Sequence, residues 1–231
     1  MKILLIFLLT LPLAASEINS LTAEEKADGW LLLFNGKDLS NWRTFNTEKP
    51  PGIGWKITEE GLLKKVSKIP GGSIISKRKF DDFILSWEWK ISPKGNNGIK
   101  YLVEEERPKA AGPEYQMLDD QGHPDGKRGA NRQTAALYDI FEPTKDKPLK
   151  PAGEWNLSKI IVQGNRVEHW LNDKKVLEYE LGSEPLKAAI AKSKFKNAEG
   201  FGNKVSGHIM LTDHIDECFF KNVKIRPGLL E

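Results

Sequence analysis

Residues 83–91, Phe-Ile-Leu-Ser-Trp-Glu-Trp-Lys-Ile, form the clearest alternating stretch of the chain. Successive side chains of a strand point to opposite faces, so every second residue shares a face. One face of this segment would carry only apolar side chains, namely Phe83, Leu85, Trp87, Trp89 and Ile91. The intervening positions are mostly polar. The pattern predicts a long strand whose apolar face lies in a core between two sheets.

Further strand-like segments lie on both sides of this stretch and are separated by Gly, Pro, Asn and Asp. They cover residues 29–36, 55–57, 61–66, 73–76, 95–103, 114–120, 134–141, 155–163, 166–171, 175–181, 207–211 and 218–225. Helix signals are confined to residues 20–28, with Ser20 or Thr22 as the cap, and to residues 183–193, with Ser183 as the cap. This order predicts an antiparallel β-sandwich with one or two short helices.

The first 16 residues, MKILLIFLLTLPLAAS, combine a basic Lys2, an apolar run from Ile3 and small residues at the end. This layout is typical of a secretory signal peptide, and the apolar run is short for a membrane span. We therefore expect a secreted or periplasmic protein without stable membrane insertion. An uncleaved N-terminal anchor is the alternative. The remaining residues, 17–231, predict one domain.

The overall composition is nearly balanced in charge, with 35 Lys and Arg against 32 Asp and Glu. The two signs are interspersed, so no nucleic-acid partner is predicted. The most basic run, Lys-Ser-Lys-Phe-Lys at residues 192–196, is interpreted as a solvated surface. The single cysteine, Cys218, excludes an internal disulfide and is expected to be a small buried side chain.

The stretch from Asn96 to Asp120, NNGIKYLVEEERPKAAGPEYQMLDD, places polar side chains on two adjacent predicted strands. Glu114 and Gln116 would share a face, whereas Asp119 would join them only if the strand contained a bulge. Paired carboxylates about 5–5.5 Å apart serve retaining glycosidases, and a half-exposed polar strand is an equal alternative. Lys100 would either line a cleft or protect an edge strand from aggregation.

Two histidine-containing pairs are further candidates. His169 shares a predicted face with aliphatic residues, which suits a hydrogen-bonded core histidine at least as well as a catalytic one. Asp213 and His214 lie at a strand end, where they would either converge on a site or form a turn. Asp119, Asp120 and His123 could approach a metal ion, but they form no compact loop of oxygen ligands, so metal binding stays open. No cofactor is predicted.

Several longer motifs resemble, in the same order, those of the 3-keto-disaccharide hydrolase family, whose fold is similar to concanavalin A-like lectins and glucanases. The resemblance covers about residues 29–227 and rests on GGSIISKRKFDDFILSWEWKIS, NNGIKY, GPEYQMLDD, ALYDIFEP, PAGEWNLSKIIVQGNRVEHWLND, KSKFK and GHIMLTDHIDECFFKNVKIRP. It implies a concanavalin A-like jelly-roll β-sandwich of two antiparallel sheets, with a carbohydrate-sized groove on the concave sheet.

The resemblance also implies an enzymatic site. Glu114, Gln116 and Asp119 would occupy the strand that carries Glu-x-Asp-x-x-Glu in family sixteen glycoside hydrolases, but the amide of Gln116 does not suit double displacement. A ketone at C3 of the sugar acidifies the proton at C2, so a base can form an enolate that expels the C1 group, and water then adds. The resemblance assigns five catalytic residues and five residues around the substrate: Glu114 or His214 as base or acid, Lys100 and Gln116 as enolate-side donors, Asp119 as orienter, and Asn96, Tyr138, Trp155, His169 and Asp213 around them.

The chain departs from the family pattern at four positions. Asn97, Thr212, Ile215 and Asp173 stand where the family more often has Ser, Gln, Gly and Gly. The changes around His214 would alter substrate choice or remove catalysis. The expected partner is a carbohydrate, with a 3-keto-glycoside or 3-keto-disaccharide as substrate. A non-catalytic carbohydrate-binding module with Trp155 as a stacking platform is the alternative, and an ordinary glucanase comes third.

Overall fold

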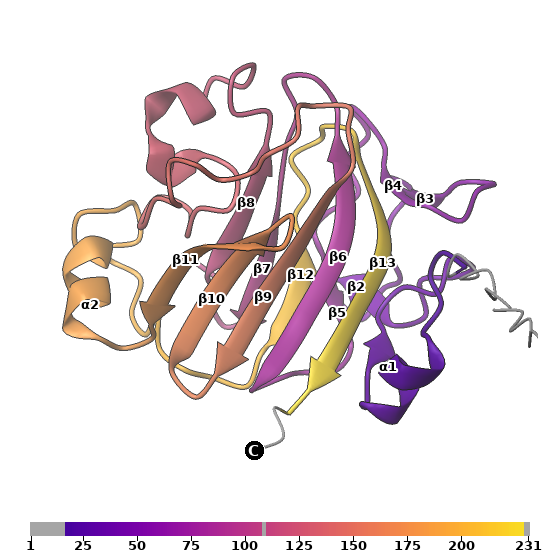
Figure 1. Ribbon diagram of the computed structural model, residues 1–231, viewed down its shortest axis with the longest axis horizontal. Coiled ribbons are helices and arrows are strands. Elements are labelled where there is room, and N and C mark those ends of the chain that lie inside the picture. Colours follow the sequence, from indigo (N-terminus) through magenta and orange to yellow (C-terminus); the bar gives the residue numbers. More distant parts are fainter. Residues whose placement is uncertain (1–16, 108–109, 229–231) are drawn as a thin grey trace, which may run out of the picture.

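A computed structural model of the chain describes residues 17–107 and 110–228, and the predicted signal peptide at residues 1–16 lies outside them. Two antiparallel sheets face each other, as Figure 1 shows. The fold prediction of a concanavalin A-like jelly-roll sandwich is thereby confirmed.

The larger sheet has eight strands in the spatial order β11-β10-β9-β6-β13-β4-β3, and β1 pairs with β13 outside this path. Its strands are β1 (Leu31–Leu32), β3 (Trp55–Ile57), β4 (Leu63–Lys65), β6 (Phe83–Ile91), β9 (Asn156–Gln163), β10 (Arg166–Leu171), β11 (Lys174–Glu180) and β13 (Cys218–Pro227).

The smaller sheet has five strands in the order β2-β5-β12-β7-β8. They are β2 (Trp42–Thr44), β5 (Ile74–Ser76), β7 (Asn96–Val103), β8 (Glu114–Leu118) and β12 (His208–Leu211). The strand β8 therefore lies at an edge of this sheet, where the following loops can fold across it.

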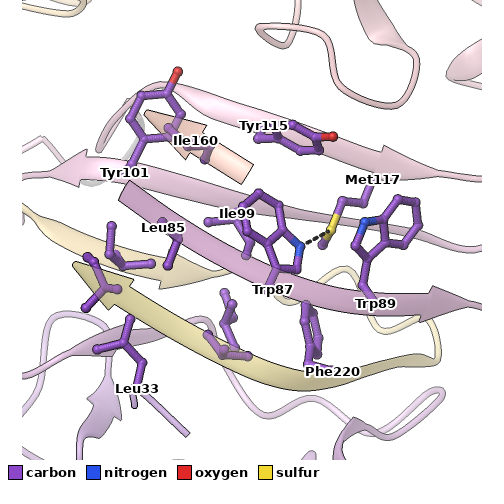
Figure 2. Packing of buried hydrophobic residues seen from close by; sticks show 14 of the residues in the cluster. Leu33, Leu85, Trp87, Trp89, Ile99, Tyr101, Tyr115, Met117, Ile160 and Phe220 are labelled. Carbon is purple, nitrogen blue, oxygen red and sulfur yellow. Dashed lines mark hydrogen bonds between the residues drawn. The ribbon is translucent and has the colours of Figure 1, made fainter. Parts of the chain in front are cut away.

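The core between the sheets is built on the alternating face of β6, as predicted. Trp87 and Trp89 are fully buried, and Figure 2 shows Trp87 against Tyr115 and Met117 of β8. The ring centroids of Trp87 and Tyr115 are 5.0 Å apart at 83°, an edge-to-face contact. Each indole N–H also has a partner, because Trp87 Nε1 donates to Met117 Sδ at 3.3 Å and Trp89 Nε1 to Ser158 Oγ at 2.8 Å. Both indole N–H groups of this strand are thus satisfied.

The short helices begin where their caps predict. Thr22 caps α1 (Ala23–Ala27) in a reciprocal capping box with Glu25, and Ser183 caps α2 (Glu184–Ile190) by accepting the N–H of Leu186 at 3.3 Å. Two 3-10 turns, η1 (Gly126–Arg128) and η2 (Ala130–Arg132), lie in the loop after β8. Figure 1 places α2 and this loop on the same side of the molecule, beyond the β8 and β11 edges.

One predicted strand, residues 134–141, is wrong. This segment makes turns, one isolated bridge from Leu137 to Tyr115 and one from Leu137 to Phe141 instead, since Ala135 and Asp139 adopt positive φ angles of 69° and 63°. Such angles interrupt an extended chain and fold the segment back over β8. Asn172 and Asp173 form the turn between β10 and β11, with φ of 45° and 64°, which suits a type I′ hairpin.

Two further expectations concern burial and the membrane. Cys218 is a free, buried cysteine, as predicted. Within the residues that the structure describes, no helix has the length and apolar character needed to cross a membrane.

Candidate functional site

The candidate site lies on the outer face of the five-stranded sheet, at β7 and β8. Tyr115 and Met117 point into the core, so the alternate residues Glu114 and Gln116 point outward. The pairing of β7 with β8 places Lys100 opposite Glu114, and no register shift interrupts it. Two charged side chains of opposite sign therefore lie side by side on one face.

The Glu114 carboxylate is nearly buried but keeps loose contact with two basic side chains. Its side chain is only 6% exposed. Lys100 Nζ lies 3.9 Å from Oε2, and His214 Nε2 lies 3.8 Å from Oε1. The His214 side chain is itself 41% exposed, so Glu114 borders solvent on the side where His214 lies. Both separations exceed hydrogen-bond distance, so the carboxylate is only loosely paired.

Glycine 98 makes this position of the carboxylate possible. Gly98 lies next to Lys100 on the same face of β7, opposite Gln116. A Cβ at this position would stand 2.3 Å from Glu114 Oε1, far inside a normal contact. The Glu114 side chain thus lies across the bare backbone of β7, which explains why the sequence has a glycine within a strand.

A third cationic group, Lys194, approaches from the loop after α2. The residue is exposed overall, yet its ammonium lies 4.0 Å from the ring centroid of Tyr138. The backbone N–H of Tyr138 in turn donates to the carbonyl oxygen of Glu114 at 3.0 Å. The Tyr138 ring therefore links Lys194 to the strand that carries the carboxylate.

The electrostatics of this cluster keep Glu114 ionised. Burial raises the pKa of the Glu114 carboxyl, but the positive charges of Lys100 and Lys194 together with the contact to His214 outweigh burial and hold the pKa below its ordinary value. For Lys194, burial lowers the pKa of the ammonium and the nearby charge of Lys100 lowers it further, against the opposing effect of Glu114. The site thus combines a desolvated carboxylate with an ammonium that gives up its proton more readily than usual.

Tyr138 is fixed by the loop after β8. Its hydroxyl donates to Asp125 Oδ2 at 2.6 Å and accepts from Arg132 at 3.1 Å. Burial and the Asp125 carboxylate raise the pKa of Tyr138, so the phenol stays protonated. The loop at residues 121–133 therefore positions Tyr138 through this network.

His214 is positioned by its neighbour Asp213, which is turned away from Glu114. Asp213 Oδ1 pairs with Nζ of the fully buried Lys65 at 3.0 Å, and Oδ2 accepts the N–H of Gly71 at 2.7 Å. The next residue, Ile215, has a φ of 59°, in the left-handed region that a β-branched residue rarely adopts. This conformation explains why the family more often has glycine there.

Asp119 lies apart from Glu114. The β7–β8 pairing contains no bulge, and Asp119 follows the last residue of β8. Its carboxylate accepts backbone N–H groups of Lys94, Gln121 and Gly122 at 2.8, 3.2 and 2.9 Å. These hydrogen bonds lower the pKa of Asp119 against the effect of burial, which raises it. The Asp119 side chain therefore stabilises the turn that follows β8.

His169 lies between the two sheets. It is fully buried, and its Nδ1 donates to the Ala135 carbonyl at 2.9 Å while Nε2 accepts from the Tyr101 hydroxyl at 2.8 Å. Burial lowers the pKa of His169 to about 4. Of the two interpretations open to the sequence, the geometry is that of a neutral, hydrogen-bonded core histidine.

The other predicted residues differ in how close they come to the cluster. Gln116 shares the face of Glu114 but is 1% exposed, and its Oε1 accepts the N–H of Met117 at 3.2 Å. Asn96 begins the neighbouring strand β7, and its backbone N–H donates to Asp216 Oδ2 at 3.0 Å. Trp155 lies elsewhere, flanked by Lys90 and Lys221 of β6 and β13 at 5.2 and 4.6 Å. Those lysines project from the outer face of the eight-stranded sheet, so Trp155 does not border Glu114.

No metal site accompanies the cluster: within residues 17–107 and 110–228, no three His, Cys, Asp or Glu side chains are grouped to hold an ion. Asp120 pairs with Lys147 at 2.7 Å, and His123 Nδ1 accepts the N–H of Asp125 at 3.1 Å. The carboxylate and imidazole that the sequence left open as ligands are thus engaged with other groups.

Lys194 is the site residue that the sequence interpretation missed. It belongs to the basic run at residues 192–196, which was expected to be a solvated surface. The run recurs in the family pattern, and that was the available signal. Charge composition alone could not show that one of its three lysines turns toward Glu114.

Comparisons with known proteins agree with this fold. The model of the 3-keto-alpha-glucoside-1,2-lyase-like domain matches residues 29–226. A protein of Bacteroides thetaiotaomicron called 3-keto-disaccharide hydrolase is 36% identical over 245 residues, which cover 93% of this chain and 83% of that protein.

Solved structures show the same similarity. The crystal structure of a candidate glycosyl hydrolase from Parabacteroides distasonis superimposes with a TM-score of 0.81 at 34% identity, covering 92% of this chain and 100% of the other. A second candidate glycosyl hydrolase from the same organism, at 24% identity and a TM-score of 0.65, covers 86% of this chain and 99% of the other and shares the fold.

Proposed function

The chain belongs to the family of 3-keto-alpha-glucoside-1,2-lyase-like domains, and from this premise we propose that it cleaves the glycosidic bond of 3-keto-glycosides, including 3-keto-disaccharides. It is a glycoside hydrolase-like enzyme. One observation carries the finer proposal: Glu114 is an ionised, nearly buried carboxylate surrounded by Lys100, Lys194 and His214.

An ordinary retaining glycosidase needs a second carboxylate about 5–5.5 Å from the first. At the positions where the strand motif would supply it, this chain has the Gln116 amide and the Asp119 carboxylate, which is held by three backbone N–H groups. This arrangement favours a reaction that needs one carboxylate and several cations. Removal of a proton next to a ketone is such a reaction, because negative charge develops on the ketone oxygen.

In the proposed reaction Glu114 removes the proton at C2 of the sugar. The electrons of the C2–H bond form an enolate, whose charge on the C3 oxygen is stabilised by Lys100. The enolate then restores the C3 ketone, forms a C1–C2 double bond and expels the C1 oxygen with its substituent. Water adds at C1 while a proton returns to C2, which completes hydrolysis without oxidation or reduction. His214 is placed to exchange protons with Glu114 between these steps.

The test compares three substrates with the purified protein: a 3-keto-glucoside, its unoxidised parent glucoside and a β-glucan. We expect sugar release from the keto compound alone. Release from the β-glucan would support a glucanase, and binding of the sugars without release would support a carbohydrate-binding module. Either result would overturn the proposal.

We further propose, on the basis of residues 1–16, that the enzyme acts after secretion or in the periplasm. The full chain should be exported and shortened by about 16 residues, as the mass of the exported protein would show. A protein of full-length mass that stays in the cytoplasm would contradict this.

A further inference from the structure

A pocket of about 570 Å³ adjoins the Glu114 cluster at Lys194. Its lining comes from the connection between β7 and β8 and from the loop after α2: Arg107, Ala110, Lys194, Phe195, Asn197, Ala198 and Glu199. The volume lies in the range of small-molecule sites, which is about 300–1,000 Å³. Since Lys194 belongs both to the pocket and to the cluster, a substrate held at Glu114 has this space next to it.

The walls of the pocket are apolar and firmly held. The ring of Phe195 stacks on Phe201, with centroids 4.3 Å apart and planes at 9°. Ala110 packs in the same small cluster, and both rings are nearly buried. On the rim, Arg107 is anchored by an ion pair with Glu104 and a hydrogen bond to the Glu199 carbonyl at 3.3 Å. A site with this lining suits a flat, largely apolar group.

Lys194 is the polar group at the inner end of this pocket. Among the described residues, no carboxylate oxygen lies within ion-pair distance of its ammonium, which instead rests over the Tyr138 and Phe195 rings at 4.0 and 4.9 Å. An ammonium held by aromatic faces keeps its N–H groups available for a ligand. Lys194 thus adjoins both Glu114, which would remove the C2 proton, and the pocket.

We propose that this pocket is the leaving-group subsite, that it accepts a flat apolar aglycone such as an aryl group, and that Lys194 donates the proton to the departing oxygen. The inference rests on the proposed cleavage of 3-keto-glycosides. In the elimination step the C1–O bond breaks and the oxygen leaves with its electron pair. It takes one proton from the Lys194 ammonium and departs as an alcohol or phenol. The neutral amine regains its proton from water.

Two substrates with the same 3-keto-glucosyl group separate the two parts of this proposal. Methoxide is a poor leaving group that needs a proton, whereas 4-nitrophenolate leaves readily without one and fills an apolar pocket. Lys194→Met removes the ammonium and keeps most of the stem. Ala198→Trp fills the pocket. Lys196→Met changes an exposed lysine on the same loop that does not line the pocket, and serves as the control.

The two variants should show opposite preferences. Lys194→Met should lower kcat/KM for the methyl compound by about 10²–10⁴ and for the 4-nitrophenyl compound by less than about tenfold. Ala198→Trp should lower kcat/KM for the 4-nitrophenyl compound by about tenfold and leave the methyl compound within about twofold. The control should match wild type on both. Equal losses on the two substrates in either variant would overturn the corresponding part of the proposal.

A separate readout covers failure of the proposed reaction itself. If wild type cleaves neither keto compound, the proton-donor role is excluded. Saturation-transfer NMR with unoxidised 4-nitrophenyl glucoside then tests the pocket directly. Aryl signals that are present with wild type and Lys196→Met and absent with Ala198→Trp would support the pocket. Equal signals with all three proteins would overturn it.

Discussion

The two faces of β7 and β8 carry contrasting polar chemistry. On the inner face, Tyr101, His169 and Tyr179 form a closed chain of short hydrogen bonds, in which the hydroxyls of Tyr101 and Tyr179 are 2.5 Å apart. On the outer face, Lys100 and His214 stay 3.8–3.9 Å from Glu114. The inner groups are neutral and fully partnered, whereas the outer groups are charged and loosely paired.

This difference separates residues that hold the fold from residues available for chemistry. A buried network with every partner in place stabilises one arrangement and has no free group to offer. A desolvated carboxylate among loosely placed cations is costly for stability and suited to proton transfer. The same sequence motif can therefore supply both kinds of residue, because a one-residue step along a strand moves a side chain to the other face.

The largest expected effect is on the outer face. Glu114→Gln keeps the shape of the side chain but removes the base, so kcat/KM for a 3-keto-glucoside should fall by about 10²–10⁴. Glu88→Gln, which changes a carboxylate paired with Lys221 at 3.2 Å, should stay within about twofold of wild type. Steady-state kinetics measure both. If the kcat/KM of Glu114→Gln were close to that of wild type, Glu114 would not be the catalytic base.

The inner face should show its effect in stability against pH. The pKa of His169 is lowered to about 4, below the ordinary value of about 6.5, so folding favours the neutral ring. Its contribution is complete above pH 6.5 and is lost as the pH falls toward 4, by about 2–3 kcal/mol. Urea unfolding at several pH values should show a shallower pH dependence for His169→Gln than for wild type. Asn203→Gln, at an exposed residue without a titratable group, is the control and should retain the wild-type slope.

The Asp119→Ala variant tests whether this carboxylate stabilises the fold instead of taking part in catalysis. Asp119→Ala leaves the N–H groups of Lys94, Gln121 and Gly122 without their acceptor and should cost about 1–3 kcal/mol in unfolding free energy. Its kcat/KM at low temperature should stay within about threefold of wild type. The exposed Glu154→Ala should change stability by less than about 0.5 kcal/mol. A loss of activity as large as that of Glu114→Gln would show that Asp119 takes part in catalysis.

The smallest expected effect is at Ile215, next to His214. Its left-handed backbone costs a branched residue about 1–2 kcal/mol, and the flexibility of glycine offsets part of the relief. Ile215→Gly should therefore raise the unfolding free energy by up to about 1 kcal/mol. Ile53→Gly, at a residue that is 77% exposed, should give no such gain. A loss of stability at Ile215 would show that its side chain contributes more than the strain costs.

The fold was largely readable from the sequence because its signals are local. Alternation along residues 83–91 identified the core face, and the caps at Thr22 and Ser183 located both helices. The strand prediction for residues 134–141 failed because their composition suits a strand, whereas the positive φ angles of Ala135 and Asp139 turn the backbone. Those angles follow from contacts with β8 that sequence periodicity does not contain.

The site was readable only in part. Alternation placed Lys100 and Glu114 on adjacent strands, but register decides whether they meet, and only the folded sheet fixes it. Whether His169 is a core histidine or a catalytic one depended on which segment packs against it, and the sequence does not show that the Ala135 carbonyl does so. The fold of a loop brings Lys194, 80 residues further along the chain, near enough to Glu114 for their charges to interact, and no local pattern could predict that proximity.

The central claim is that Glu114 removes the C2 proton of a 3-keto-sugar, and proton exchange tests it most directly. A 3-keto-glucoside is incubated with wild type or Glu114→Gln in deuterium oxide, and the deuterium at C2 of the released sugar and of the remaining substrate is measured by NMR. We expect C2 deuterium with wild type at least as fast as sugar release, and almost none with Glu114→Gln. Sugar released by wild type with its C2 proton fully retained would contradict the account.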